Sequence, residues 1–207
     1  MIRLDITPQA RLVVLVSGNG SNLQAILDAT ASGVLQAEVA LVVSNVAGVP
    51  ALERAAAAGV ARCVLERRRN EARADYDTRL TAVVADARPD WVVLAGWMRI
   101  LTMGFLGRFP NHVLNLHPAL PGELPGTGAV EQAYAEARKG LRTRTGVMVH
   151  LVPDEGVDDG PVLASAEVPI RADDSYADLA RRVHDCEHSL LVSTLAGLIY
   201  AKDGVHD

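Results

Sequence analysis

Two polar side chains stand two positions apart at the end of an apolar run. Leu116 separates Asn115 from His117, and Pro118 follows directly. In an extended chain positions i and i+2 face the same side, so the Asn115 amide and the His117 imidazole point together. An amide donor beside an imidazole is suited to stabilising an oxyanion that develops during a reaction. A strand-end histidine satisfied by a backbone carbonyl is the structural alternative.

An acidic, glycine-rich stretch at residues 154–161 could supply a partner for this histidine. It lies between two apolar runs and contains the neighbouring carboxylates Asp158 and Asp159. A carboxylate that pairs with His117 would hold its imidazole in the protonated state. A solvated turn is the alternative for a segment of this composition.

A second glycine-rich segment follows the first apolar run. Its glycines permit a tight turn and a close approach of the backbone to a ligand, and the helix expected after it directs free N–H groups at the turn. This pattern favours a phosphate site at Asn19, Gly20, Ser21 and Asn22. It is not a dinucleotide fingerprint, because Leu23 stands where the third glycine belongs. A tight turn without a ligand is the alternative.

Residues 184–188 match the zinc-binding pattern His-x-x-Glu-His. His184 and His188 would share one face of a helix. A catalytic zinc needs a third protein ligand, and the only acidic residues that follow are Asp203 and Asp207. We therefore expect no metal site and interpret this segment as a helix face near the surface.

The segments that could carry chemistry follow short runs of apolar, often β-branched residues. Runs that are apolar on both faces are typical of a parallel sheet covered by helices. Ala- and Leu-rich stretches with helical spacing alternate with them. The expected strands are residues 11–16, 38–43, 60–65, 91–95, 112–116, 147–152 and 161–169. The expected helices are residues 22–31, 51–58, 71–87 and 175–199, the last with Ser175 as its N-cap.

This alternation predicts an α/β fold, with a doubly wound, mostly parallel sheet flanked by helices in a single domain. The domain is expected to span residues 1–207, with residues 1–9 and 202–207 as loose tails. Ligands of such sheets bind at the carboxyl ends of the strands. The polar segments described above lie at or beyond the ends of expected strands, which is where a site is expected.

The composition excludes several classes of function. The 207 residues contain 20 Lys and Arg against 25 Asp and Glu, a formal net charge of −5. Without a basic excess we expect no nucleic-acid partner. No signal peptide is expected, and no run reaches about 18 apolar residues, so no membrane span is expected either. The expected location is the cytoplasm.

Taken in order, the motifs resemble those of the glycinamide ribonucleotide formyltransferases, within the folate-dependent formyltransferase family. The Asn-x-His-Pro piece marks the wider family, and Gly-Asn-Gly-Ser-Asn-Leu is similar to the loop of members that hold a ribonucleotide phosphate. The matching stretches are residues 15–26, 93–101, 114–120 and 157–162.

The resemblance implies transfer of a formyl group from 10-formyltetrahydrofolate to the primary amine of glycinamide ribonucleotide, in purine biosynthesis. It implies a catalytic trio of Asn115, His117 and Asp158, and a phosphate loop at the four residues from Asn19 to Asn22. His150 matches a histidine that ends a strand in the family. The implied folate-binding residues are Trp97, Met98, Arg99, Ile100, Leu101 and Asp154.

The implied mechanism is direct attack of the amine on the formyl carbon, without a metal. Asn115 and a protonated His117 would stabilise the tetrahedral oxyanion, and a water held by Asp158 would carry the proton between the two nitrogens. The acidic loop is one residue longer than in the family, so Asp159 stays an alternative to Asp158. The loop at residues 121–128 also departs from the family, with a Glu and a Gly where a basic residue and a histidine are common. The expected assembly is a monomer or homodimer.

Several related or different activities compete with this interpretation. A formyltetrahydrofolate hydrolase carries an extra N-terminal region, and a methionyl-tRNA formyltransferase carries an added C-terminal domain and a basic surface. A sugar-nucleotide formyltransferase would leave the Ser21-Asn22 loop unexplained. A folate- or nucleotide-binding protein without activity and a zinc peptidase are the alternatives from other classes.

Overall fold

The apolar runs form one seven-stranded sheet. The computed structural model of the chain describes residues 9–203, and the side chains of residues 9–201. The strand order is β3-β2-β1-β4-β5-β6-β7. All neighbouring pairs from β3 to β5 are parallel, and β6 pairs antiparallel with both β5 and β7. The strands are β1 (Ala10–Val16), β2 (Ala37–Ser44), β3 (Arg62–Val64), β4 (Trp91–Leu94), β5 (Val113–His117), β6 (Arg144–Leu151) and β7 (Val162–Pro169).

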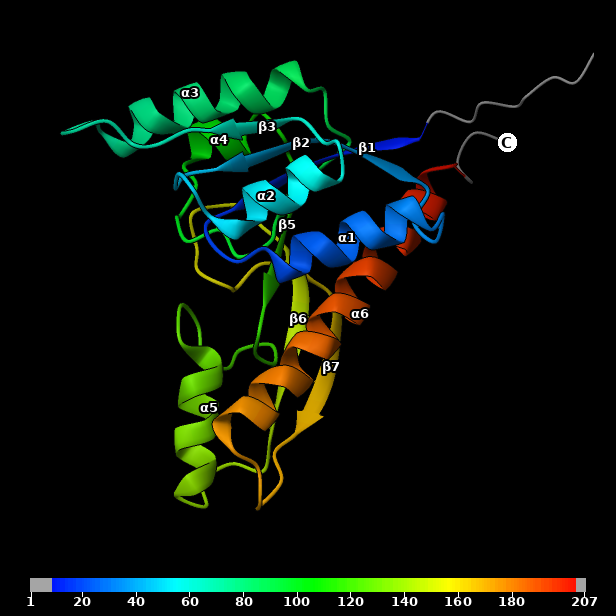
Figure 1. Cartoon of the computed structure of the whole chain (residues 1–207). Helices are drawn as coiled ribbons and strands as arrows, with labels where there is room; N and C mark the ends of the chain where they lie inside the picture. The colour runs from blue at the N-terminus through cyan, green and yellow to red at the C-terminus, as the bar shows by residue number, and fades with distance from the viewer. Residues whose placement is uncertain (1–8, 204–207) are drawn as a thin grey trace, which may run out of the picture.

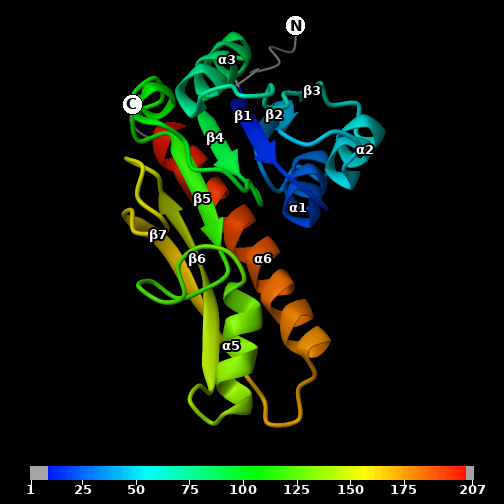
Figure 2. The same cartoon turned by 90° about the vertical axis from the view of Figure 1, so that its left-hand side faces the viewer.

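Helices cover both faces of this sheet, as the two views of the molecule show (Figures 1 and 2). One core cluster joins the sheet to α1, α2 and α6, and a second joins its other face to α3 and α4. The α/β fold with a mostly parallel, doubly wound sheet is therefore confirmed. The helices are α1 (Ser21–Ala31), α2 (Pro50–Ala57), α3 (Arg73–Asp86), α4 (Met103–Leu106), α5 (Ala129–Arg138) and α6 (Tyr176–Asp203).

The alternation of buried side chains along the strands explains the two clusters. Along β1, Leu12, Val14 and Val16 pack in the first cluster, while Val13 and Leu15 pack in the second. Successive residues of a strand point to opposite faces, so a strand covered on both sides is apolar throughout. This is why the continuous apolar runs predicted the central strands correctly.

Several element boundaries differ from the expectation. The third strand is three residues long instead of six, because it is an exposed edge strand that pairs only with β2. The helix expected from residue 71 begins at Arg73. Two helices were not expected, α4 and α5; α4 is a single turn, and the buried residues of α5 are mostly alanine, which gives a weak apolar pattern.

The expected loose tails at residues 1–9 and 202–207 can be compared with the structure only in part. Residues 1–8 and 204–207 lie outside the described residues. The last helix continues to Asp203, so Lys202 and Asp203 are helical and not part of a tail. None of the described helices is long and apolar enough to cross a membrane.

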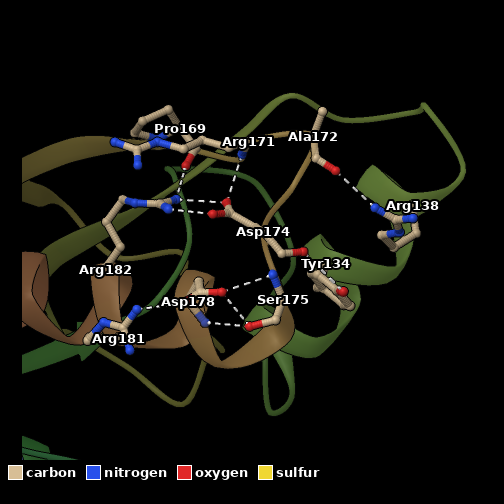
Figure 3. A network of polar contacts seen from close by, with 10 residues as sticks. All are labelled: Tyr134, Arg138, Pro169, Arg171, Ala172, Asp174, Ser175, Asp178, Arg181 and Arg182. Carbon is tan, nitrogen blue, oxygen red and sulfur yellow. Dashed lines mark hydrogen bonds and ion pairs between the residues drawn. The ribbon is translucent and has the colours of Figure 1, made fainter.

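The start of α6 is fixed by a network of polar contacts (Figure 3). Asp174 accepts hydrogen bonds from both terminal nitrogens of the Arg182 guanidinium, at 2.9 and 2.6 Å. The Ser175 hydroxyl accepts a hydrogen bond from the Asp178 N–H, while the Asp178 carboxylate accepts one from the Ser175 N–H. This reciprocal pair is a capping box, which confirms Ser175 as the N-cap.

The topology brings the chemistry-bearing loops to one edge of the sheet. The strand order reverses between β1 and β4, and the loops after parallel strands at such a point frame a ligand site. The loops after β1, β4 and β5 all start there. In the antiparallel pairing of β5 and β6, His150 lies directly opposite Asn115.

Candidate active site

Asn115 and His117 lie on one side of β5 and line the same cavity. The intervening Leu116 packs with Leu114 in the core on the opposite face. The i and i+2 relation therefore places the amide and the imidazole together, as expected. Asn115 is half-buried, and His117 is buried with 3% of its surface exposed.

Asp158 joins the two side chains from the loop between β6 and β7. Its Oδ1 accepts a hydrogen bond from Asn115 Nδ2 at 2.9 Å, and its Oδ2 lies 3.3 Å from His117 Nδ1. The Gly126 N–H donates a further hydrogen bond to Oδ2 at 2.8 Å. Asp159, in contrast, is exposed. The fold thus brings Asp158, and not Asp159, to Asn115 and His117.

A fourth side chain, His150, completes this cluster from β6. Its Nε2 lies 3.1 Å from Asn115 Nδ2 and 3.5 Å from Asp158 Oδ1. Its Nδ1 lies 2.8 Å from the carbonyl oxygen of Leu151, which can only accept, so Nδ1 carries a proton. The ring is 2% exposed and fixed from both nitrogens.

The Asp158 carboxylate is stabilised in its charged form. Burial, the largest single influence, raises its pKa. Hydrogen bonds from His150 and the Gly126 N–H, with the charges of His117 and His150, act in the opposite direction. The pKa of Asp158 consequently lies below its usual value. The carboxylate is ionised at neutral pH and favours a cationic neighbour.

The His117 ring is held by contacts at both nitrogens. Nε2 lies 2.9 Å from the carbonyl oxygen of Leu124, and this acceptor requires a proton on Nε2. Nδ1 faces Asp158. The alternative of a histidine bonded to a backbone carbonyl and the expected carboxylate partner are thus both present, one at each nitrogen. A second ring proton would sit on Nδ1, on the side of the carboxylate.

A cavity of about 460 Å³ opens beside this cluster. The exposed side chains of Met98, Ile100 and Val157 give it apolar walls. Every residue that the resemblance assigned to folate lines it: Trp97, Met98, Arg99, Ile100, Leu101 and Asp154. An apolar cavity with a few convergent polar groups is the usual form of a small-molecule site.

The segment after β4 that forms one wall of the cavity is tied down at both ends. The Ser17 hydroxyl accepts a hydrogen bond from the Met98 N–H at 2.9 Å, and Asp77 accepts one from the Thr102 N–H at 2.6 Å. The guanidinium of Arg99 lies 4.4 Å from the centre of the Tyr76 ring, a cation–π contact. This wall is therefore preformed.

The glycine-rich loop lies next to the start of α1, and none of its four expected phosphate ligands lines the cavity. Gly20 is the N-cap, with a φ of 76°, and no side chain caps the helix. The first N–H groups of α1 are thus available to an anion. The buried Oδ1 of Asn22 has no hydrogen-bond partner among the described residues.

Arg54 of α2 fixes the outer side of this loop. Its Nε donates to the Asn19 carbonyl at 3.0 Å, and its two terminal nitrogens reach the side-chain oxygens of Asn19 and Gln24, each at 3.2 Å. Sequence reasoning missed this residue, because nothing in the chain from residue 19 to residue 54 indicates that α2 packs against the loop.

In the segment of α6 that matches the zinc-binding pattern, two side chains contact each other and no metal is needed to explain them. His184 Nδ1 lies 2.6 Å from a carboxylate oxygen of the buried Glu187, and this hydrogen bond is the main influence that raises the pKa of His184. Within residues 9–201 no three His, Cys, Asp or Glu side chains are grouped to hold a metal ion.

Comparison with known proteins identifies the family. A family model described as formyl transferase matches residues 10–195. The phosphoribosylglycinamide formyltransferase of Schizosaccharomyces pombe is 42% identical, over 92% of this chain and 97% of the relative. The chain belongs to this family of formyltransferases. The Escherichia coli phosphoribosylglycinamide formyltransferase is 41% identical, over 86% of this chain and 82% of the relative.

Solved structures agree with this assignment, which confirms the resemblance. Glycinamide ribonucleotide transformylase 1 from Symbiobacterium toebii matches this formyltransferase with a TM-score of 0.87 and 36% identity, over 93% of this chain and 89% of that one. The chain also matches trifunctional purine biosynthetic proteins, such as that of Drosophila pseudoobscura pseudoobscura at 42% identity. This match covers 94% of the present chain but only 14% of the length of that relative.

Proposed function

We propose that this formyltransferase moves the formyl group of 10-formyltetrahydrofolate to the amine of glycinamide ribonucleotide, as a single domain. The observation that carries the proposal is the convergence of Asn115, His117 and Asp158 at the wall of an apolar cavity. The 42% identity to a phosphoribosylglycinamide formyltransferase over nearly its whole length supports the choice of substrates.

The cavity suits the ring system of a folate. Met98, Ile100 and Val157 offer apolar contact to a flat ring, and backbone groups of the preformed segment at residues 97–101 offer hydrogen bonds to its edge. Asp154 also lines the cavity. The folate brings the formyl group, which is already activated by its bond to nitrogen, and no metal is assigned a role.

The phosphate of the ribonucleotide is assigned to the start of α1. Free N–H groups and the positive end of the helix dipole favour an anion there. Asn19, Gly20, Ser21 and Asn22 surround this position. The amine at the other end of the substrate then extends toward Asn115, because both loops leave the same edge of the sheet.

The geometry of the trio supports the following catalytic roles. Asn115 Nδ2 and a proton on His117 Nδ1 donate hydrogen bonds to the oxyanion, which forms when the amine adds to the formyl carbon. Fixed donors aimed at such a developing charge typically contribute about 10²–10³-fold in rate. Asp158 holds the cationic form of His117. A water bound to Asp158 takes the proton that the amine loses and returns one to the leaving nitrogen.

An assay with both substrates tests this proposal. Formation of formylglycinamide ribonucleotide should require both 10-formyltetrahydrofolate and glycinamide ribonucleotide. A control without the amine measures the competing hydrolysis to formate. Release of formate at the same rate with and without the amine would assign the chain a hydrolase activity and overturn the proposal.

The location and the assembly of the enzyme are further parts of the proposal. We assign it to the cytoplasm, as a monomer or homodimer with small-molecule substrates and without a nucleic-acid or membrane partner. Sedimentation of the purified protein decides between the two assemblies.

A further inference from the structure

The loop between β5 and α5, residues 118–128, contacts two members of the proposed catalytic trio, His117 and Asp158, through its backbone. The Leu124 carbonyl oxygen lies 2.9 Å from His117 Nε2, and the Gly126 N–H donates to Asp158 Oδ2 at 2.8 Å. The position of this loop therefore controls how His117 and Asp158 face each other.

The backbone at Leu124 adopts a conformation that needs support. Its φ is 46°, in the left-handed region that a side chain with a Cβ disfavours. Its side chain is buried in a small cluster with Ala119, Ala129 and Ala133. This conformation turns the Leu124 carbonyl toward the imidazole, so contacts that fix the loop also fix the catalytic ring.

An ion pair holds the loop through Arg142, in the connection between α5 and β6. One terminal nitrogen of Arg142 pairs with the carboxylate of Glu123, the residue before Leu124. Its Nε donates to Glu136 Oε2 of α5 at 2.8 Å. The guanidinium side chain is only 16% exposed. A single planar cation thus joins the loop to α5, and the compact ammonium of a lysine could not reproduce this fork.

The guanidinium of Arg142 does not touch the reacting groups, so any influence on catalysis acts through Leu124. A carbonyl that accepts from one imidazole nitrogen decides which tautomer the neutral ring adopts. Here the fixed proton is on Nε2, and Nδ1 is left as the nitrogen that gains or loses a proton. Nδ1 is also the nitrogen that faces Asp158.

We propose that Arg142 is a positioning residue: the contact Glu123–Arg142–Glu136 holds the Leu124 carbonyl on His117 Nε2 and so keeps the exchangeable proton on Nδ1. This inference rests on the proposed function for its catalytic consequence. The placement of the ring proton is a property of the protein alone and can be measured without substrate.

The first test is spectroscopic. The chain has six histidines, and labelling them with ¹⁵N separates the two neutral tautomers by the ¹⁵N shifts of the ring. His117 is assigned as the signal missing from the His117→Ala variant. In the alkaline range the native protein should have the Nε2–H tautomer, and Arg142→Met should populate the Nδ1–H tautomer as well. An unchanged His117 signal in Arg142→Met overturns the proposal.

The second test is kinetic. Arg142→Met keeps the apolar stem, and a small misplacement of the catalytic ring should lower kcat about 10-fold to 100-fold while both KM values change little. The matched control is Arg144→Met, which breaks the exposed pair with Glu167 on the neighbouring strand and should leave kcat nearly unchanged. Equal losses of kcat in the two variants would overturn the proposal.

A third variant keeps the proposal testable if Arg142→Met does not fold. Glu123→Gln retains the size of the side chain and weakens the same contact, so it should cause the same tautomer change. Where Arg142→Met does fold, the double variant Glu123→Gln/Arg142→Met should be no slower than Arg142→Met, and multiplied losses would contradict a shared contact. If the native protein does not transfer formyl groups, the proposed function fails, while the ¹⁵N measurement still decides the inference.

Discussion

At the scale of single residues, the candidate site depends on four buried or half-buried polar side chains that satisfy one another. Asn115, His117, His150 and Asp158 come from three segments, and each is in contact with at least one of the others. Buried polar groups without partners cost about 1–3 kcal/mol each, so removing one member leaves its partners unsatisfied. The residues are therefore expected to act as a unit.

The choice between the two neighbouring carboxylates gives the first prediction. Asp158→Asn should lower kcat by about 10²-fold or more, because it removes the negative charge that faces His117 Nδ1, and should change the KM values little. Asp159→Asn is the matched control, since that side chain is exposed and should tolerate the change. Steady-state kinetics of the two variants test this choice. A strongly reduced kcat in Asp159→Asn together with a nearly native kcat in Asp158→Asn would assign the catalytic role to Asp159 instead.

The sequence predicts part of this site and leaves the rest undetermined, for a physical reason. The spacing of Asn115 and His117 follows from strand geometry, so their common orientation was predictable. Asp158 comes from a distant loop whose acidic composition suggested a carboxylate partner for His117, but only the resemblance favoured Asp158 over Asp159. The Leu124 carbonyl and the Gly126 N–H are backbone groups, which every residue carries, so residue types gave no signal for them.

At the scale of elements, the turn before α1 depends on the absence of a side chain at Gly20. A Cβ at this position would lie 2.6 Å from the Cβ and 2.8 Å from the Cα of Ala51, and the φ of 76° is itself unfavourable for other residues. The loop and α2 therefore fit together only with glycine. This packing determines the position of the free N–H groups of α1.

Gly20→Ala should consequently raise the KM for glycinamide ribonucleotide strongly and leave folate binding nearly unchanged. The matched control is Gly197→Ala, where a Cβ meets nothing within 4 Å on an exposed helix position. That variant should keep both KM values and gain up to about 1 kcal/mol of stability. Equal loss of affinity for both substrates in Gly20→Ala would refute the assignment of the loop to the phosphate.

The start of α6 gives a prediction about stability and pH. The hydrogen bond from Arg182 is the largest influence that lowers the pKa of Asp174, from 3.8 to about 2. A carboxylate whose pKa is lower in the folded state stabilises the fold above its ordinary pKa, and the contribution is lost as the pH falls through the folded value. The network in Figure 3 should therefore stabilise the protein at neutral pH and weaken between about pH 4 and pH 2.

Thermal unfolding of Asp174→Asn measures this effect. The variant should have a lower Tm than the native protein at neutral pH, and the difference should shrink as the pH falls through the same acidic window. Asp173→Asn, at the adjacent exposed position, serves as the control and should have nearly the native Tm. A Tm difference that stays constant down to pH 2 would show that Asp174 acts through something other than its charge.

Helices were predictable from the sequence where a capping signal and an apolar pattern both mark the same segment. The start of α6 was predictable, because the Ser175–Asp178 spacing is a local signal. The helix α5 was not, because Gly128 begins it without a side-chain cap and its buried positions are Ala129, Val130 and Ala133. Small buried side chains produce little periodicity, so this helix depends on tertiary contacts with α6 and β6.

At the scale of the whole molecule, the fold places the two proposed half-sites, the glycine-rich loop and the cavity, after neighbouring strands at one edge of the sheet. The glycine-rich loop follows β1, and the cavity wall follows β4, which is its neighbour in the sheet. Ser17 links the two, because its hydroxyl accepts a hydrogen bond from the Met98 N–H. The doubly wound topology, which the apolar runs predicted, brings both loops to the edge of the sheet at which β5 and its Asn115 and His117 also end.

Hydrogen exchange can map the two half-sites separately. A folate analogue should protect backbone amides at residues 97–101 and 154–158, which line the cavity. Glycinamide ribonucleotide should instead protect residues 19–23 at the start of α1. Protection of the α1 loop by the folate analogue alone would mean that the two half-sites have been assigned in reverse.

The central claim, that Asn115, His117 and Asp158 form one catalytic unit, is tested most directly by the kcat of the double variant His117→Ala/Asp158→Asn. Each single change should lower kcat by a comparable factor of about 10²–10³, since Asp158 acts through the imidazole. The double variant should be about as slow as the slower single variant, because either single change already removes the interaction between His117 and Asp158. A kcat reduced by the product of the two single losses would mean that the residues act independently and would contradict the account.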